Sequence, residues 1–320
     1  MSSVQARHLT LGVRLLFFTL AVLVLRHELA GVDHSDLLAG FRSYGPFQIA
    51  AALGLTAASF LTLGSLEVLT LRHIGGCSAH AVRRRTAIST AYVAHAFSQS
   101  AGFAILTGAV IRLRTYVRYG VDAVSVARLS AFVTLTMTLG LLAITGIALL
   151  TGDAMFVAHR GMRAGIAGAV LILPPLAYLA WSVLGRQSGI GRGPWRIPRP
   201  SPGLAGGQLA LSALDWLITG LVLFVLLPAR FVAPYSTFLA AYMLAQAVGF
   251  VSQIPGGVGV FDATLLAFLA PFAGIGSLAA SLVIYRIIYY LLPLCAAIVV
   301  FGFGEWRSRT PAPAAGAPNA

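Results

Sequence analysis

Long apolar segments, separated by short stretches rich in arginine, glycine and proline, make up most of this chain of 320 residues. A helix that crosses a bilayer needs about 17 or more predominantly apolar residues. No cleavage pattern of small residues follows the first apolar segment, 9–25, so we expect this segment to be a retained anchor rather than a signal peptide. Six segments predict full membrane spans: 9–25, 46–71, 124–150, 164–184, 204–227 and 275–303. The pattern therefore predicts an all-α, polytopic membrane protein.

Two further apolar segments, 87–111 and 235–272, are interrupted near their middle. Proline lacks a backbone donor and glycine loses much entropy when ordered, so neither continues a helix well. Within hydrocarbon, a broken helix persists only inside protein or beside a watery cavity. Each break is therefore predicted to mark a place where a polar group can enter. The break residues are Ser98, Gln99 and Gly102 in the first segment, and Ser252, Gln253, Pro255, Gly256, Gly257 and Gly259 in the second.

The positions of the arginines predict how these segments are threaded. Arginine clusters lie at 83–85, 112–128 and 186–199, whereas the loops 151–163 and 228–234 are poor in arginine. All three clusters face the cytoplasm only if 87–111 enters the membrane and returns, as the positive-inside rule favours. The same reasoning makes 235–272 a hairpin that enters from the outside. We therefore expect about six full spans, two re-entrant hairpins from opposite faces, and both termini in the cytoplasm.

The two hairpins resemble each other in sequence. In each, a Ser-Gln pair begins four residues before a glycine, at Ser98 and at Ser252. Broken helices in corresponding positions of two halves are typical of an inverted repeat. We therefore predict one membrane domain, 1–306, with halves of about 1–185 and 204–306, a linker at 186–203, and a disordered tail at 307–320.

Composition excludes several other classes of protein. Only 10% of the residues are charged and 58% are hydrophobic, whereas soluble domains carry roughly 25% charged residues. The net charge of +13 comes from arginines beside apolar segments, which favours anionic lipid as the partner rather than nucleic acid. The sequence has no histidine pair at metal-ligand spacing, no G-x-S-x-G and no P-loop, so we predict no enzyme activity, no metal and no cofactor.

Four charged residues lie within apolar segments and are candidates for function: Glu67, Asp215, Asp262 and Arg286. A charge at the centre of a membrane helix costs about 2.5 to 3.5 kcal/mol, so each is expected to be either functional or held in an ion pair. Arg286 could pair with Asp215 or Asp262, and Asp262 could instead complement a helix dipole. Glu67 could reach the interface. Asp215 has no basic neighbour in its own segment, which favours function.

Arginines and tyrosines extend the candidate binding set. Arg112 and Arg114 directly follow the first hairpin, and the arginine fork suits a phosphate group. Plain anchoring at the cytoplasmic face is the alternative for both. Tyr285 and Tyr289 stand at helical spacing on either side of Arg286, where they could line a cavity or form hydrogen bonds inside the bundle.

Five stretches carry a resemblance to a known family. They are SLEVLTLRHIG (65–75), FSQSAGFAILTGAVIRLRTYVRYG (97–120), LDWLITGLVLFVLLP (214–228), SQIPGGVGVFD (252–262) and YRIIYYLLP (285–293). Together they resemble the membrane domain of the lysylphosphatidylglycerol synthetase/flippase family, of the multiple peptide resistance factor type, and its stand-alone relatives. By position, Glu67, Arg112, Asp215 and Asp262 match polar residues that matter in that family. The family usually has Asp at the position of Glu67 and Glu at that of Asp262, which puts headgroup selectivity in question.

The resemblance implies a multi-pass protein of the bacterial inner membrane that moves a lipid between leaflets. Its expected partners are membrane lipids with anionic or aminoacylated headgroups, with a homo-oligomer or a lipid-synthesis enzyme as further possibilities. The cytosolic domain that aminoacylates phosphatidylglycerol in bifunctional members has no counterpart in these 320 residues. Two alternatives remain: a non-transporting membrane partner of a lipid-modifying or glycosyl-transferring enzyme, and a component of a lipid aminoacyltransferase.

Overall fold

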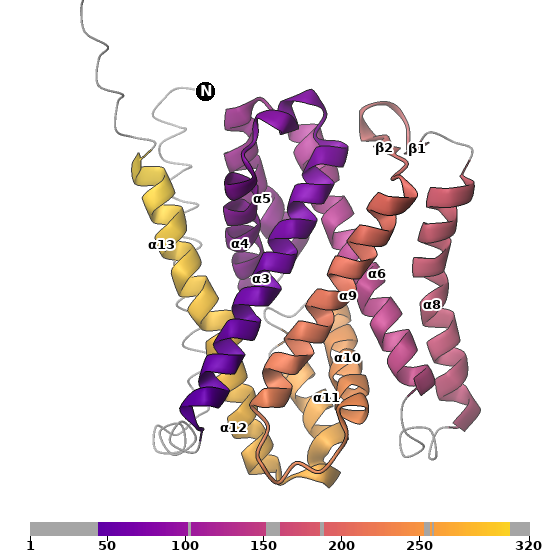
Figure 1. The fold of residues 1–320 in the computed structure, drawn as a ribbon, viewed down its shortest axis with the longest axis vertical. Coiled ribbons are helices and arrows are strands. Elements are labelled where there is room, and N and C mark those ends of the chain that lie inside the picture. Colours follow the sequence, from indigo (N-terminus) through magenta and orange to yellow (C-terminus); the bar gives the residue numbers. More distant parts are fainter. Residues whose placement is uncertain are drawn as a thin grey trace, which may run out of the picture.

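The computed structural model describes residues 44–101, 104–151, 161–185, 189–252, 257 and 259–307. These residues form a bundle of helices with one small pair of strands (Figure 1). The predicted first span at 9–25 and nearly all of the predicted tail lie outside the described residues. So do four of the predicted break residues, Gly102, Gln253, Pro255 and Gly256.

Long apolar helices confirm the prediction of a polytopic, all-α membrane protein. They are α3 (Pro46–Ile74), α6 (Ala123–Thr151), α8 (Gly161–Leu184), α9 (Pro202–Val225), and a last span made of α12 (Ile275–Tyr285), η6 (Arg286–Leu291) and α13 (Leu292–Arg307). Proline opens both α3 and α9, where its missing N–H and fixed backbone angle suit the first helical position. Ser201 caps α9 by accepting a hydrogen bond from the N–H of Leu204 at 3.3 Å.

Both interrupted segments fold as helical hairpins. The first hairpin consists of α4 (Arg84–Ala101) and α5 (Ala104–Tyr116), and the second of α10 (Tyr235–Ser252) and α11 (Val260–Leu269). Figure 1 shows them at opposite ends of the bundle, with their breaks near its middle. Gly257 and Gly259 at the second break have φ of 63° and 79°, a left-handed conformation that favours glycine.

The structure changes two details of the predicted hairpins. The arms α4 and α5 extend beyond the predicted segment 87–111 at both of its ends, because arginine is a good helix former and the flanking arginines continue both helices. Arg112 and Arg114 therefore lie within α5 rather than after it. Among the described residues, six helices are long and apolar enough to cross a membrane, and the 18-residue α10 is one of them. Figure 1 nevertheless places α10 beside α11 in one half of the bundle, as a hairpin arm.

The order of elements repeats along the chain. A span, a hairpin and a second span occur as α3, α4–α5 and α6, and again as α9, α10–α11 and α12–α13. Between the two sets lie α8 and a short antiparallel pair, β1 (Gly189–Ile190) and β2 (Ile197–Pro198), joined through η3 (Gly193–Trp195). The remaining short turns are η1 (Cys77–Ala81), η2 (Val117–Tyr119) and η5 (Ala270–Phe272). Because the two hairpins lie at opposite ends, this order fits the predicted inverted repeat.

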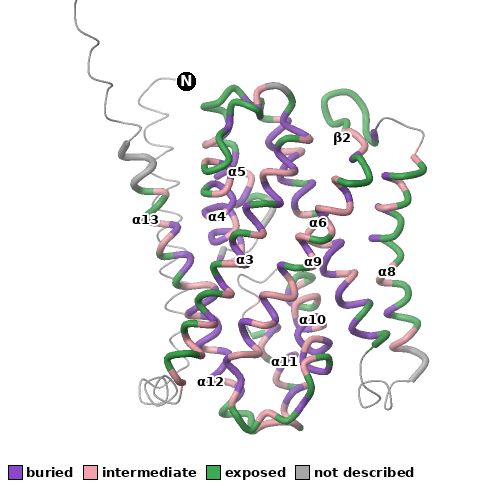
Figure 2. Tube along the Cα trace, viewed as in Figure 1, coloured by how far each residue is buried: buried purple, intermediate pink, exposed green. Residues whose placement is uncertain are grey.

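Close helix contacts fix the centre of the bundle, where buried residues concentrate (Figure 2). A Cβ added at Gly140 of α6 would collide with the Ser212 side chain of α9, so only glycine allows this approach. A Cβ added at Gly146 of α6 would likewise lie too close to the backbone oxygen of Gly168 in α8. On its other side α8 exposes Ile166, Val170 and Leu173 at helical spacing, as a face toward lipid would.

Candidate functional site: a cavity between the hairpins

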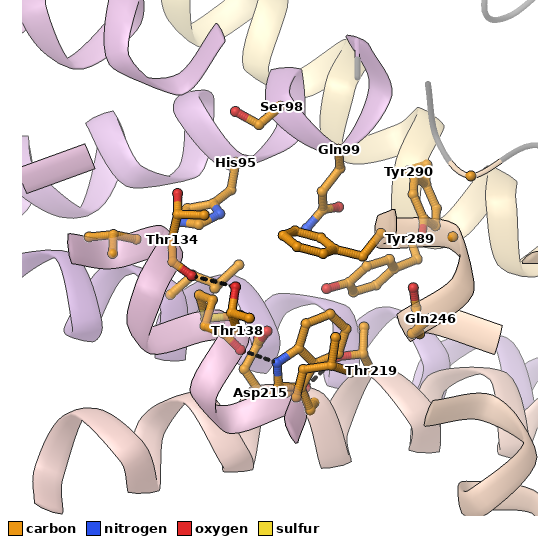
Figure 3. A pocket seen from close by; sticks show the side chains of 18 of the residues that line it. His95, Ser98, Gln99, Thr134, Thr138, Asp215, Thr219, Gln246, Tyr289 and Tyr290 are labelled. Atoms are coloured by element: carbon orange, nitrogen blue, oxygen red, sulfur yellow. Dashed lines mark hydrogen bonds between the residues drawn. The ribbon is translucent and has the colours of Figure 1, made fainter. Parts of the chain in front are cut away.

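A cavity of about 210 Å³ lies where the two hairpins meet the long helices. Residues of both hairpins, of α3, α6 and α9, and of η6 line it (Figure 3). Its polar lining comprises His95, Ser98, Gln99, Arg112, Thr134, Thr138, Asp215, Thr219 and Gln246, and its aromatic lining comprises Trp216, Phe250, Phe261, Tyr289 and Tyr290. The predicted break residues Ser98, Gln99 and Gly257 thus contribute to one cavity. Ser252 and Gly259 do not line it.

Asp215 is the acid that faces this cavity. Its side chain is buried in α9, and Ser59 Oγ donates a hydrogen bond to its Oδ1 at 2.6 Å. Thr62 Oγ1 donates to the same oxygen at 3.1 Å. Within the described part of the chain, Asp215 forms no ion pair. A buried carboxylate that has hydroxyl donors but no cation is suited to bind a positively charged or hydroxylated group.

Glu67 and Arg112 form a buried ion pair between α3 and α5. Arg112 binds both carboxylate oxygens through Nε, at 2.8 and 3.0 Å, and through Nη2, at 2.8 Å. Tyr116 donates a fourth hydrogen bond to Glu67 at 2.9 Å, and His95 lies 3.5 Å from Nη2. Because Glu67 occupies two of the three guanidinium nitrogens, the predicted phosphate contact would have to use Nη1.

Asp262 and Arg286 form the second ion pair, one of the two pairings that the sequence left open for Arg286. Arg286 Nη2 lies 2.6 Å from Asp262 Oδ2, and Nε lies 3.2 Å from Oδ1. Asp262 also accepts the backbone N–H of Gly259 at 2.9 Å, which caps α11. Neither residue lines the cavity, and the pair instead joins the second hairpin to the last span.

The tyrosines of the last span divide between the cavity and the packed interior. A π-helix covers Arg286–Leu291, a geometry that often occurs at functional sites. Tyr289 and Tyr290 line the cavity. Tyr285 does not line it; its ring stacks on Tyr289 with centroids 5.5 Å apart, and its hydroxyl lies 2.8 Å from that of Tyr242.

Arg114 lies away from the cavity lining, with its guanidinium carbon 5.5 Å from the centre of the Phe301 ring.

Both amides in the lining, Gln99 and Gln246, come from hairpin arms. In Figure 3, Gln99 extends into the cavity from the side opposite Asp215 and Thr219. Its Oε1 is buried and has no hydrogen-bond partner among the described residues. An unpaired buried acceptor costs about 1 to 3 kcal/mol, so a ligand or water that donates to it is favoured.

Sequence reasoning missed several lining residues: His95, Thr134, Thr138, Trp216, Thr219 and Gln246. His95 stands four residues before Gln99, so helical spacing on the arm of the first hairpin was the one available signal. Gln246 lies on α10 and faces the same cavity only through tertiary packing. Within the described residues, no group of three His, Cys, Asp or Glu side chains could hold a metal ion.

Comparison with known proteins adds a family to this geometry. Residues 11–297 match the family model described as lysylphosphatidylglycerol synthase TM region. The chain is 27% identical over 298 residues to the uncharacterized protein slr0712 of Synechocystis sp., covering 90% of this chain and 89% of that protein. It is 25% identical over 300 residues to the inner membrane protein YbhN of Escherichia coli, covering 92% of each. It is also 25% identical over 299 residues to a phosphatidylglycerol lysyltransferase of Staphylococcus aureus, covering 89% of this chain and 33% of that longer protein.

Proposed function

Since the chain belongs to the lysylphosphatidylglycerol synthase TM-region family, we propose that it binds the headgroup of a membrane phospholipid in the cavity and moves the lipid between leaflets. The observation that carries the proposal is the cavity where two hairpins from opposite ends of the bundle meet. Such a meeting point of broken helices is where membrane transporters commonly hold their substrate.

The chemistry of the lining favours a headgroup that carries a cation or several hydroxyls. The Arg112 charge is offset by Glu67, whereas Asp215 has no such partner among the described residues. Asp215 would bind an ammonium or hydroxyl group, and Gln99 and Gln246 would hydrogen-bond to glycerol hydroxyls or ester oxygens. Tyr289 and Tyr290 would pack against the apolar part of the headgroup. The acyl chains would remain in the bilayer.

A proteoliposome assay tests transport. The purified chain is reconstituted with phosphatidylglycerol or lysyl-phosphatidylglycerol labelled on an acyl chain with a fluorophore that an impermeant reductant quenches. Protein-free vesicles lose only the outer-leaflet fluorescence, whereas active vesicles lose nearly all of it. Asp215→Asn should slow exchange about tenfold or more, as expected if at least about 1.4 kcal/mol of headgroup binding is lost. Asp122→Asn makes the same chemical change outside the membrane-spanning helices and should leave the rate unchanged. Equal rates in wild-type and protein-free vesicles would refute transport.

One observation favours a second candidate function. In the Staphylococcus aureus relative, the matching region is a third of a protein named as a lysyltransferase, so a similar membrane region can belong to a lipid-modifying enzyme. The chain would then present a lipid to a separate enzyme without moving it. Copurification of such an enzyme, together with absence of exchange by the pure chain, would support this candidate.

We also propose an inner-membrane location in which the arginine-rich end of the bundle faces the cytoplasm. The start of α4, the end of α5 and the β1–β2 pair all lie at the end of the bundle that α13 approaches (Figure 1). Cysteines introduced singly at Ser78 and Ser277, in a chain with Cys77 and Cys295 replaced, test this. An impermeant maleimide added to intact cells should label only the Ser277 position, and the reverse pattern would contradict the orientation.

A further inference from the structure

Asp215 differs from two other acids of the described membrane helices, Glu67 of α3 and Asp262 of α11. Glu67 and Asp262 each face an arginine, whereas Asp215 meets only hydroxyl groups in the described part of the chain. An ionised carboxylate that is buried without a cation is strongly disfavoured, and it is relieved by binding either a cation or a proton. The same side chain borders the cavity, so either ligand has a route to it.

Ser59 connects Asp215 to a second hydroxyl. Its Oγ lies 2.6 Å from Asp215 Oδ1 and 2.9 Å from the hydroxyl of Tyr289, which also borders the cavity. Either atom can donate in the Ser59–Tyr289 bond. When Asp215 is ionised, Ser59 donates to Asp215 and the Tyr289 hydroxyl donates to Ser59. When Asp215 carries a proton, the chain can reverse, with Asp215 donating to Ser59 and Ser59 donating to Tyr289. The arrangement therefore accommodates both protonation states without moving a heavy atom.

Other charged or titratable groups surround this site from the neighbouring elements, but none of those described forms an ion pair with Asp215. Glu67 of α3 and Arg112 of α5 offset each other, as do Asp262 of α11 and Arg286 of η6. The lining that α6 contributes, Val133, Thr134, Met137, Thr138 and Leu141, contains no titratable side chain. Further titratable groups on these elements include His95 of α4, Tyr178 of α8, Tyr235 and Tyr242 of α10, Tyr285 of α12, and Tyr289 and Tyr290 of η6.

We propose that Asp215 is a proton-binding site whose proton exchanges with the cationic group of the lipid headgroup, so that a proton gradient can drive lipid movement. This mechanism rests on the proposed function. A carboxylate that carries a proton cannot also pair with an ammonium group, so the two ligands exclude each other at this site. The proton comes from water in the cavity and returns to water when the headgroup binds, and no covalent bond to the lipid forms.

Infrared difference spectroscopy of the full chain in lipid nanodiscs, recorded between acidic and alkaline buffers, tests the site without a transported lipid. The wild type should show the carbonyl band of a protonated carboxylic acid that is lost on alkalinisation. This band should be absent in Asp215→Asn and present in Asp122→Asn. Tyr289→Phe keeps the carboxyl group but removes the terminal hydroxyl of the chain, so it should keep the band at a shifted frequency. Identical difference spectra for wild type and Asp215→Asn would overturn the proposal.

Proteoliposomes with an imposed pH gradient test the coupling. The inner-to-outer ratio of acyl-labelled lysyl-phosphatidylglycerol should shift about tenfold per pH unit in the wild type, as one-for-one exchange requires. Labelled phosphatidylglycerol, which lacks the ammonium groups, should not respond. Lipid exchange without an Asp215 band would overturn the proton site and leave the proposed function standing. An Asp215 band without exchange of either lipid would retain the proton site and overturn both the coupling and the proposed function.

Discussion

The two hairpins are attached to their neighbouring spans by the same chemistry in opposite arrangements. In the first, the cation Arg112 lies on the hairpin and the acid Glu67 on the span α3. In the second, the acid Asp262 lies on the hairpin and the cation Arg286 on the last span. The side chains of Arg112 and Glu67 in the first pair are 5% and 0% exposed. In the second pair Arg286 is 8% exposed and Asp262 is 22% exposed, so the difference lies in the acids.

This difference in burial indicates that the two hairpins have different mechanical roles. Glu67 in the first pair is fully buried and Arg112 nearly so, so breaking this pair leaves a charge with little access to water. Water can reach Asp262, so the second pair can open at a smaller cost. We therefore expect the first hairpin to form a fixed wall of the cavity and the second to be the one that moves.

The largest effect is expected for Glu67→Ala, which leaves Arg112 buried without its partner. Removing one member of a buried ion pair typically costs about 3 to 5 kcal/mol. Thermal unfolding of the purified chain in detergent measures this loss. Its control is the double variant with Arg112→Met, which removes both charges and should recover most of the stability. Equal losses in the single and double variants would show that the charge left behind is not the cause.

Tyr116→Phe should have the next largest effect, because it removes the tyrosine hydrogen bond to Glu67 without touching the ion pair. Hydrogen bonds to charged groups contribute about 1.5 to 3 kcal/mol. The same unfolding measurement applies, with Tyr119→Phe as the control, since Tyr119 lies on an exposed turn next to the same helix. A loss no larger than in the control would mean that Tyr116 is not needed to hold this pair.

Asp262→Asn tests the second pair and should destabilise the chain less than Glu67→Ala does. Asparagine can still accept the N–H of Gly259, so only the ion pair is lost. Because water reaches Asp262, this loss should be smaller than the about 3 to 5 kcal/mol typical of a fully buried pair. Hydrogen exchange followed by mass spectrometry should show faster exchange in α11 than in α5. Faster exchange in α5 would reverse the roles assigned to the two hairpins.

The smallest loss of stability is expected at the start of the helix that follows a hairpin, α6 after the first and α12 after the second. Asp122 precedes α6 and accepts the backbone N–H of Ser125 at 2.9 Å, whereas α12 is preceded by Gly274, which has no capping side chain. Hydrogen bonds from the Ser125 side chain and backbone lower the pKa of Asp122. Because the pKa of Asp122 is lower in the folded chain, its ionised form stabilises the fold at pH values above the unfolded pKa near about 4. That contribution is lost as the pH falls through the folded pKa. Asp122→Ala should therefore reduce the melting temperature slightly at pH 7 and not at pH 2, and an equal loss at both would contradict this.

The sequence predicted the hairpins because their signals are local. Gly257 and Gly259 adopt backbone angles that most residues avoid, and the positions of the arginines favoured a segment 87–111 that enters the membrane and returns over one that crosses it. The Asp262–Arg286 pair was also within reach, because few buried cations were available to an acid in that part of the chain. Both inferences needed only residue type and position.

The cavity could be predicted only in part, because its lining depends on which helices cross. Asp215 was identified as unusual from its own segment, and the structure places it in the lining. The Glu67–Arg112 pair was missed because its members lie 45 residues apart and each had a plausible separate role at the interface. Gln246 and Thr134 carry no signal of their own, since neutral polar residues are ordinary in membrane helices and only the fold brings these two together.

The π-helix at Arg286–Leu291 lets the last span contact both hairpins, which lie on different sides of it. One extra residue in a helix rotates all the following side chains about the helix axis by about 100°, because 3.6 residues complete a turn. Below the insertion Arg286 reaches Asp262 of the second hairpin, and above it Pro293 accepts the hydroxyl of Tyr92 from the first. Deleting Ile287 would keep the span long enough to cross the bilayer but would rotate one attachment away from its hairpin. The insertion thus sets the relative alignment of the two ends of the bundle.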